Sequence, residues 1–158
     1  MKKIIASISL AMLLALALTS TTLAASGVPF KGAMQAVEIY TVNFPILKVD
    51  ASGSGNATHL GTFTVSYHDV VDLITLTGPD SLTFVAANGD SLFADGTGKA
   101  TPTETPNVLR IVETFAITGG TGRFAGATGS FTITRLLNTV TGATSGTFDG
   151  TIVFARHE

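Results

Sequence analysis

Hydrophobic and polar residues alternate along several short segments of the chain, as they do in β-strands that bury one face. The clearest segment runs from Ala57 to Asp69, where Phe63, Val65 and Tyr67 share one parity and the residues between them are polar. Successive side chains of a strand point to opposite faces, so this segment predicts a strand with one face toward a core and one toward water. Gly61 interrupts it, as a bulge or a barrel bend would.

Four other segments show the same period of two. We expect strands at 30–40, 108–118, 131–137 and toward the end of the chain. Three of them, 30–40, 108–118 and 131–137, carry a charged residue within an otherwise apolar face. The apolar faces are Phe30, Met34, Ala36 and Tyr40 with Glu38; Leu109, Ile111, Phe115 and Ile117 with Glu113; Phe131, Ile133 and Leu137 with Arg135; and Phe148, Ile152 and Phe154.

Turn-forming residues separate these segments. Asn88-Gly89 predicts a β-hairpin with a type I′ turn, which needs positive φ at both central positions. Further turns are expected at 78–80 and at 141–142. The polar, glycine-rich stretch 50–56 predicts a flexible loop that separates the first strand from the main sheet. The stretch 95–107, with two prolines, predicts a second loop.

The stretch Ile117–Ser130 contains five glycines and lies between two predicted strands. It predicts a sharp corner at which the sheet turns back. About eight strands are expected in all, and no segment has a sustained helical period. The chain is therefore predicted to be all-β, an antiparallel, calycin-like barrel of about eight strands, because closure removes exposed sheet edges.

The first 24 residues are typical of a cleaved signal peptide. Lys2 and Lys3 precede an apolar run, and Thr22-Leu23-Ala24 provides a cleavage site of small residues. The apolar run is shorter than the roughly 20 residues of a membrane helix. We therefore expect a single domain over 25–158, secreted or periplasmic, with cleavage near Ala24 and no membrane span.

Charge and cysteine content narrow the function classes. Without Lys2 and Lys3, seven basic residues remain against 11 acidic ones, a formal net charge of −4. Nucleic acids and anionic membranes are poor partners for such a surface. The chain has no cysteine, which excludes disulfides, thiolate metal ligands and cysteine nucleophiles.

The segments 88–92 and 117–129, each followed by a strand, resemble the C-terminal half of dirigent proteins and allene oxide cyclases. The core of the resemblance is Gly-Gly-Thr-Gly-Arg-Phe at 119–124, and the similarity spans roughly Asn56 to Phe154. It is strongest to secreted bacterial proteins with the same barrel. The resemblance implies an eight-stranded barrel with a central cavity, trimeric in many plant members. It leaves the activity open, because the chain lacks the lumen cysteine of the cyclases and the paired-aspartate stretch of the dirigent proteins.

Five residues are candidates for binding a ligand inside the barrel: Glu113, Tyr67, Arg135, Phe63 and Phe115. Glu113 lies on an apolar face, where a carboxylate is costly unless it has partners or borders a wet cavity. The alternatives for Glu113 are an ion pair with Arg110 or Arg135 at a subunit interface, or an exposed position on a twisted strand. Arg135 either binds an anionic ligand or forms an ion pair at the rim. Tyr67 either holds a ligand oxygen or is a core residue. The residues expected opposite Glu113 are 126–128.

No metal or cofactor is predicted. His59, His68 and His157 are not spaced with other ligands as zinc or iron sites require. Asp69 and Asp72, beside His68, are expected at a solvated strand end. Arg123 is expected to brace the glycine corner, since the loop leads into a strand and not into the helix that a phosphate loop requires.

Three functions remain open. The first is a barrel that binds a small apolar or amphipathic molecule in its lumen without catalysis. The second is a dirigent- or cyclase-like isomerase that steers a reactive intermediate, with Glu113 and Tyr67 as polar groups in a water-poor pocket. The third is an envelope or extracellular scaffold in which the barrel forms a homotrimer. The sequence does not decide whether the protein is an enzyme.

Overall fold

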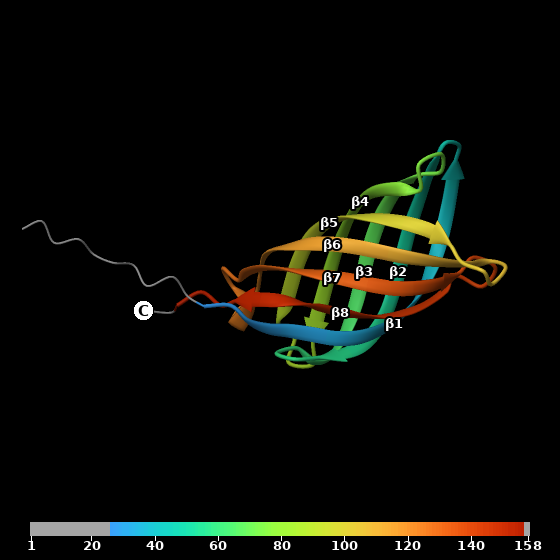
Figure 1. Cartoon of the computed structure of the whole chain (residues 1–158). Coiled ribbons are helices and arrows are strands. Elements are labelled where there is room, and N and C mark those ends of the chain that lie inside the picture. The colour runs from blue at the N-terminus through green and yellow to red at the C-terminus, as the bar shows by residue number, and fades with distance from the viewer. Residues whose placement is uncertain (1–25, 157–158) are drawn as a thin grey trace, which may run out of the picture.

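The computed structural model describes residues 26–156, so the predicted signal peptide lies outside the described residues. Eight antiparallel strands follow one another and close into a barrel, with β8 pairing with β1 (Figure 1). This confirms the predicted all-β, eight-stranded antiparallel barrel. Within the described part, no helix has the length and hydropathy of a membrane span. The strands are β1 (Val28–Asn43), β2 (Ile46–Ala57), β3 (Gly61–Asp72), β4 (Thr77–Ala86), β5 (Ser91–Pro102), β6 (Val108–Gly120), β7 (Thr128–Asn138) and β8 (Ala143–Val153).

The two ends of the barrel differ. The end that carries Ser26 and Arg156, here called the termini end, also holds the β2–β3, β4–β5 and β6–β7 connections (Figure 1). The opposite end, here called the far end, holds the connections 44–45, 73–76, 103–107 and 139–142. All connections except β6–β7 are short, as expected for a meander of antiparallel strands.

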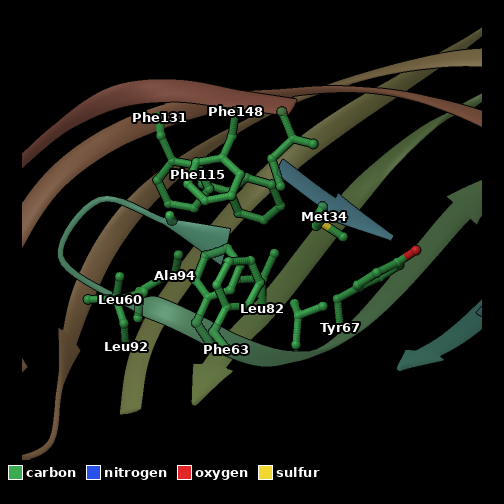
Figure 2. Packing of buried hydrophobic residues seen from close by; sticks show 14 of the residues in the cluster. Met34, Leu60, Phe63, Tyr67, Leu82, Leu92, Ala94, Phe115, Phe131 and Phe148 are labelled. Atoms are coloured by element: carbon green, nitrogen blue, oxygen red, sulfur yellow. The ribbon is translucent and has the colours of Figure 1, made fainter. Parts of the chain in front are cut away.

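The predicted inward faces of the alternating segments are confirmed. In the half near the termini end, phenylalanine rings from six strands fill the barrel (Figure 2). Phe84 is fully buried and contacts the rings of Phe30, Phe63, Phe131 and Phe148, with centroids 4.8–6.2 Å apart. Each fully buried phenylalanine contributes about 1.5–3 kcal/mol through the hydrophobic effect. This half is therefore a packed core with the function of holding the barrel together.

Three predicted loops or turns are wrong. The stretch 50–56 belongs to β2 and pairs on both sides, with β1 and β3, so it does not separate the first strand from the sheet. Most of 95–107 belongs to β5, and only 103–107 forms a loop. The stretch 78–80 belongs to β4, and the turn lies earlier, at 73–76.

Close packing explains why glycine-rich segments form strands here. A Cβ atom on Gly53 would lie 2.0 Å from the backbone oxygen of Gln35, and one on Gly55 would lie 2.5 Å from the ring of Phe63. Glycine is disfavoured in strands by propensity, but tight approach of a neighbouring strand or ring requires it. Tertiary packing therefore overrides the local preference.

The hairpin at Asn88-Gly89 is confirmed, but the type I′ turn is wrong. Only Gly89 has a positive φ, at 88°, and the amide of Ala86 donates to the carbonyl of Asp90 at 2.9 Å. A type I′ turn needs positive φ at both central residues. The loop is thus longer than two residues, with glycine at its single left-handed position.

The corner at 117–130 is confirmed as the turn between β6 and β7. It contains a short 3₁₀ turn, η1 (Gly122–Phe124), whose Phe124 is fully buried. The backbone amide of Arg123 donates to a carboxylate oxygen of Asp90 at 3.2 Å, and its guanidinium donates to the carbonyl of His59. Arg123 thus links three connections of the termini end, in keeping with the predicted brace.

Candidate functional site

The barrel is hollow in its other half. A partly open cavity of about 280 Å³ lies between the phenylalanine core and the far end. Its volume is at the lower limit of small-molecule pockets, which measure about 300–1,000 Å³. Apolar side chains form most of its wall, and charged side chains gather on part of it. The apolar lining includes Val42, Leu47, Val49, Val71, Leu73, Leu76, Ala100, Leu109, Ile111 and Leu137, and the charged lining includes Glu38, Asp69, Asp80, Glu113 and Arg135.

Arg135 is the centre of the charged lining. Its Nε donates to Glu113 Oε2 at 2.9 Å, and its Nη2 donates to Glu113 Oε1 at 2.5 Å. Its Nη1 donates to a carboxylate oxygen of Glu38 and to the hydroxyl of Thr144, the latter at 3.2 Å. Burial lowers the pKa of Arg135, but hydrogen bonds and charge attraction to Glu113 outweigh this effect and raise it above its ordinary value. Arg135 is therefore a permanent cation whose donors are directed at protein carboxylates.

Glu38 connects Arg135 to two phenols. Tyr67 donates to Glu38 Oε1 and Tyr40 donates to Glu38 Oε2, each at 2.9 Å. Figure 2 shows Tyr67 at the edge of the packed core, with its hydroxyl directed away from the phenylalanine rings. Burial and the negative charge of Glu38 raise the pKa of both phenols, so they remain protonated donors. Tyr67 thus joins the packed half of the barrel to the charged lining.

Asp69 and Asp80 lie directly opposite each other on β3 and β4. Their residues are only 7% and 6% exposed. One oxygen of each, Oδ1, is buried without a hydrogen-bond partner. Burial raises the pKa of Asp69 to about 6, and burial together with the hydrogen bond to Asp69 raises the pKa of Asp80 to about 10. The two carboxyls therefore act as a coupled pair, in which burial and the mutual interaction favour the protonated form.

The lumen cluster is defined as Glu38, Tyr67, Asp69, Asp80, Glu113 and Arg135. It contains four carboxyl groups and one guanidinium, and one ion pair beyond those of Glu38 and Glu113 joins Arg135 Nη2 to Asp69 Oδ2 at 3.5 Å. Carboxyl groups therefore outnumber cations in this part of the cavity wall.

Glycines on the neighbouring strands leave room for the two long side chains. Glu113 lies opposite Gly98 on β5, and a Cβ there would be 2.7 Å from Glu113 Cγ. Arg135 lies opposite Gly146 on β8, and a Cβ there would be 2.6 Å from Arg135 Cβ. On the β7 side, Glu113 lies opposite Ile133, so the predicted register with 126–128 is wrong.

The structure separates the five predicted ligand-binding residues. Glu113 and Arg135 line the cavity, and Tyr67 contacts their network through Glu38 and through its ring, whose centroid is 5.0 Å from Arg135 Cζ. Phe63 and Phe115 are buried in the packed half instead. Of the alternatives for Glu113, the ion pair with Arg135 is the one observed, and it is buried and not at a rim.

Sequence reasoning missed the aspartate pair. Asp69 was expected at a solvated strand end, and this is wrong, because it continues the inward parity of Phe63, Val65 and Tyr67. Asp80 was assigned to a turn, although it shares parity with Leu82, Phe84 and Ala86. Extending each alternating series by one inward position would have found both aspartates.

The structure also brings together three carboxyl groups that the sequence did not connect. Ligand atoms of Asp69, Asp80 and Glu113 lie within 4.8 Å of one another. Carboxylate oxygens are the ligands that hard divalent cations take. However, both oxygens of Glu113 already accept hydrogen bonds from Arg135, so this cluster offers fewer free ligands than its composition suggests.

Comparison of the chain with protein-family models, with curated proteins and with solved structures finds no match.

Proposed function

We propose that this protein is a secreted or periplasmic β-barrel that binds one small amphipathic molecule in the cavity at its far end. The observation that carries the proposal is the division of the barrel into two halves. Aromatic rings fill one half, and the other encloses about 280 Å³ with an apolar wall and a charged patch at its inner side. An apolar pocket with a few convergent polar groups is the usual form of a small-molecule site.

The rim of the cavity supports the same function. Three of the four far-end loops expose a large apolar side chain: Phe44 is 73% exposed, Ile74 71% and Val140 73%. Such residues are costly in water, and when several gather around one opening they favour contact with an apolar ligand or partner. An apolar tail can therefore remain in contact with nonpolar surface from the rim to the inner wall.

The experiment is a fluorescence titration with N-phenyl-1-naphthylamine, an uncharged apolar probe that brightens in nonpolar surroundings. Saturable binding with one site per chain is expected. Ala100→Phe, which places a ring on the cavity wall, is expected to weaken binding at least tenfold. Ala116→Phe is the matched control, because Ala116 is exposed on the outer face of β6. Absence of saturable binding, or equal binding by the two variants, would refute the proposal.

A second candidate, a dirigent- or cyclase-like isomerase, is supported by one observation. Burial and the hydrogen bond to Asp69 raise the pKa of Asp80 to about 10, so this cavity-lining carboxyl is a group able to give a proton to a bound intermediate. Mass spectrometry of small molecules retained by the purified protein would supply candidate substrates. If Asp80→Asn converts such a substrate as fast as the wild type does, this candidate is excluded for that substrate.

A further inference from the structure

The loops of the far end present apolar side chains to the surroundings. The far-end rim is defined as Phe44, Ile74 and Val140, which belong to three of the four loops at this end and are each more than 70% exposed. The loops are held to one another, since the amide of Leu73 donates to the carbonyl of Pro45 at 2.8 Å. The rim residues therefore project from an ordered frame around the mouth of the cavity.

Exposed cations lie directly behind this rim. Three of them face outward within three residues of the far end of their strands, on β2, β5 and β6: Lys48, Lys99 and Arg110. None forms an ion pair with another residue of 26–156. The outward acids of this end are Asp72 and Glu104, and the Asp72 carboxylate accepts hydrogen bonds from the amides of Ile74 and Thr75 at 2.7 and 3.1 Å. Cations thus prevail on the outer surface of the far end.

The formal net charge of −4 arises elsewhere in the molecule. Four carboxyl groups belong to the lumen cluster, where they are buried together with Arg135. Away from the far end, outward acids outnumber outward cations over residues 26–156: Asp50, Asp90, Asp95, which is exposed on the outer face of β5, and Asp149, against Lys31, Arg123 and Arg156. The overall charge therefore argues against an anionic partner for the molecule as a whole, but not for its far end.

The spacing of rim and cations matches the depth of a lipid surface. A strand rises about 3.3 Å per residue, so the three cations lie at most about 10 Å behind the ends of their strands. Apolar faces of interfacial segments enter a bilayer by about 5–10 Å. When the rim residues lie among acyl chains, the long lysine and arginine side chains reach the phosphate groups of the lipids.

We propose that the far-end rim docks on the surface of a phospholipid bilayer. Phe44, Ile74 and Val140 enter the acyl region, and the three cations contact lipid phosphates. The binding is peripheral, and it places the mouth of the cavity against the lipid. This inference goes beyond the proposed function, because docking does not require a ligand in the cavity.

A protein partner, including a second copy of this chain, is the competing occupant. Protein interfaces depend on a packed core of matching shape. The three rim residues stand on separate loops around an opening, so no continuous apolar surface joins them for a rigid partner to cover. Fluid acyl chains fill the spaces between such side chains without matching their shape. Together with the flanking cations, this arrangement favours lipid.

The first experiment locates the contact. It uses residues 25–158, which contain the closed barrel, and vesicles of phosphatidylcholine and phosphatidylglycerol. The chain has no tryptophan, so Phe44→Trp introduces a single fluorophore at the rim. Its emission is expected to shift to shorter wavelength when vesicles are added, and to be quenched by lipids with brominated acyl chains. Phe93→Trp, on the outer face of β5 near the termini end, is the matched control and should show neither change.

The second experiment measures affinity by sedimentation with the same vesicles. The triple variant Phe44→Ser, Ile74→Ser and Val140→Ser is expected to bind at least about tenfold more weakly than wild type. The double variant Lys48→Gln with Lys99→Gln is expected to bind at least about threefold more weakly. Phe93→Ser should bind as wild type does. Thermal melts establish that each variant is folded.

Three results would overturn the inference. The first is that wild type does not bind vesicles, and the second is that the triple variant binds them as tightly as wild type. The third is that Phe44→Trp emission is already shifted without vesicles and the protein sediments as a dimer, since the rim is then an interface between two copies. The titration with N-phenyl-1-naphthylamine, performed without vesicles, tests the proposed function separately, so either can fail while the other stands.

Discussion

Arg135 and Glu113 are diagonal neighbours on adjacent strands. Arg135 lies opposite Ile111 and Glu113 opposite Ile133, so the guanidinium reaches along the inner wall to meet the carboxylate with two nitrogens. Both side chains are nearly inaccessible to water. A charged pair at this depth is stable only because each charge faces the other, and removing one partner leaves the other uncompensated.

Arg135→Met is therefore expected to lower the free energy of unfolding by about 3–5 kcal/mol, measured by denaturant titration at pH 7. It removes the cation that pairs with the buried Glu38 and Glu113. Arg110→Met, an exposed arginine on β6, is the control and is expected to change stability by about 0.5 kcal/mol or less. The double variant of Glu113→Gln with Arg135→Met tests whether the two residues are coupled. If its loss of unfolding free energy equals the sum of the losses in the two single variants, they are not coupled.

Stability is expected to fall as the pH rises, because of the aspartate pair. The pKa values of Asp69 and Asp80 are raised in the folded state, to about 6 and about 10, so the folded protein holds protons that the unfolded chain releases above about pH 4. The stabilisation that these raised pKa values give is complete below about pH 4 and is lost as the pH rises through 6 toward 10.

Asp80→Asn removes the proton-binding carboxyl and is expected to flatten this dependence. The unfolding free energy of the variant minus that of wild type, measured at each pH, should rise by about 1–3 kcal/mol from pH 4 to pH 9. Asp95→Asn is expected to follow the wild-type profile throughout. A constant difference between wild type and Asp80→Asn over this range would mean that Asp80 is ionised in the folded state.

The sequence was sufficient for the architecture because parity repeats over several strands. Each inward series, such as Phe63, Val65 and Tyr67, gives the face of its strand without knowledge of any other strand. The same parity placed Glu113 and Arg135 inside the barrel. Alternation does not specify which residues of two strands lie opposite each other. The positions of Gly98 and Ile133 opposite Glu113 therefore follow only from the strand register in the structure.

Glycine-rich segments were the main source of error, for a physical reason. Glycine marks both flexible loops and the closest contacts between strands, and the sequence alone does not distinguish these. Gly53 and Gly55 were interpreted as loop residues, but they lie where no Cβ fits. Asp80 was lost in the same way, since its glycine and proline neighbours indicated a turn.

Gly53→Ala tests the packing interpretation of β2. The added Cβ would lie 2.0 Å from the carbonyl oxygen of Gln35 and 2.6 Å from Cα of Ala36, and backbone atoms can move only with the strand. A loss of at least about 1–3 kcal/mol in unfolding free energy is expected, as for overpacking of a core. Ser52→Ala, exposed on the same strand, is the control and should be near neutral. A stabilising effect of Gly53→Ala would instead indicate that this stretch is a loop.

The two halves of the barrel are expected to respond separately to substitution. Phe84→Ala removes a fully buried ring from the phenylalanine core and should cost about 3–5 kcal/mol of unfolding free energy. Phe93→Ala, at a residue that is 39% exposed, should cost much less. At a temperature where Phe84→Ala is still folded, its affinity for N-phenyl-1-naphthylamine should equal that of wild type within about twofold, because Phe84 does not line the cavity. A large loss of affinity in the folded variant would show that the core half also sets the shape of the binding half.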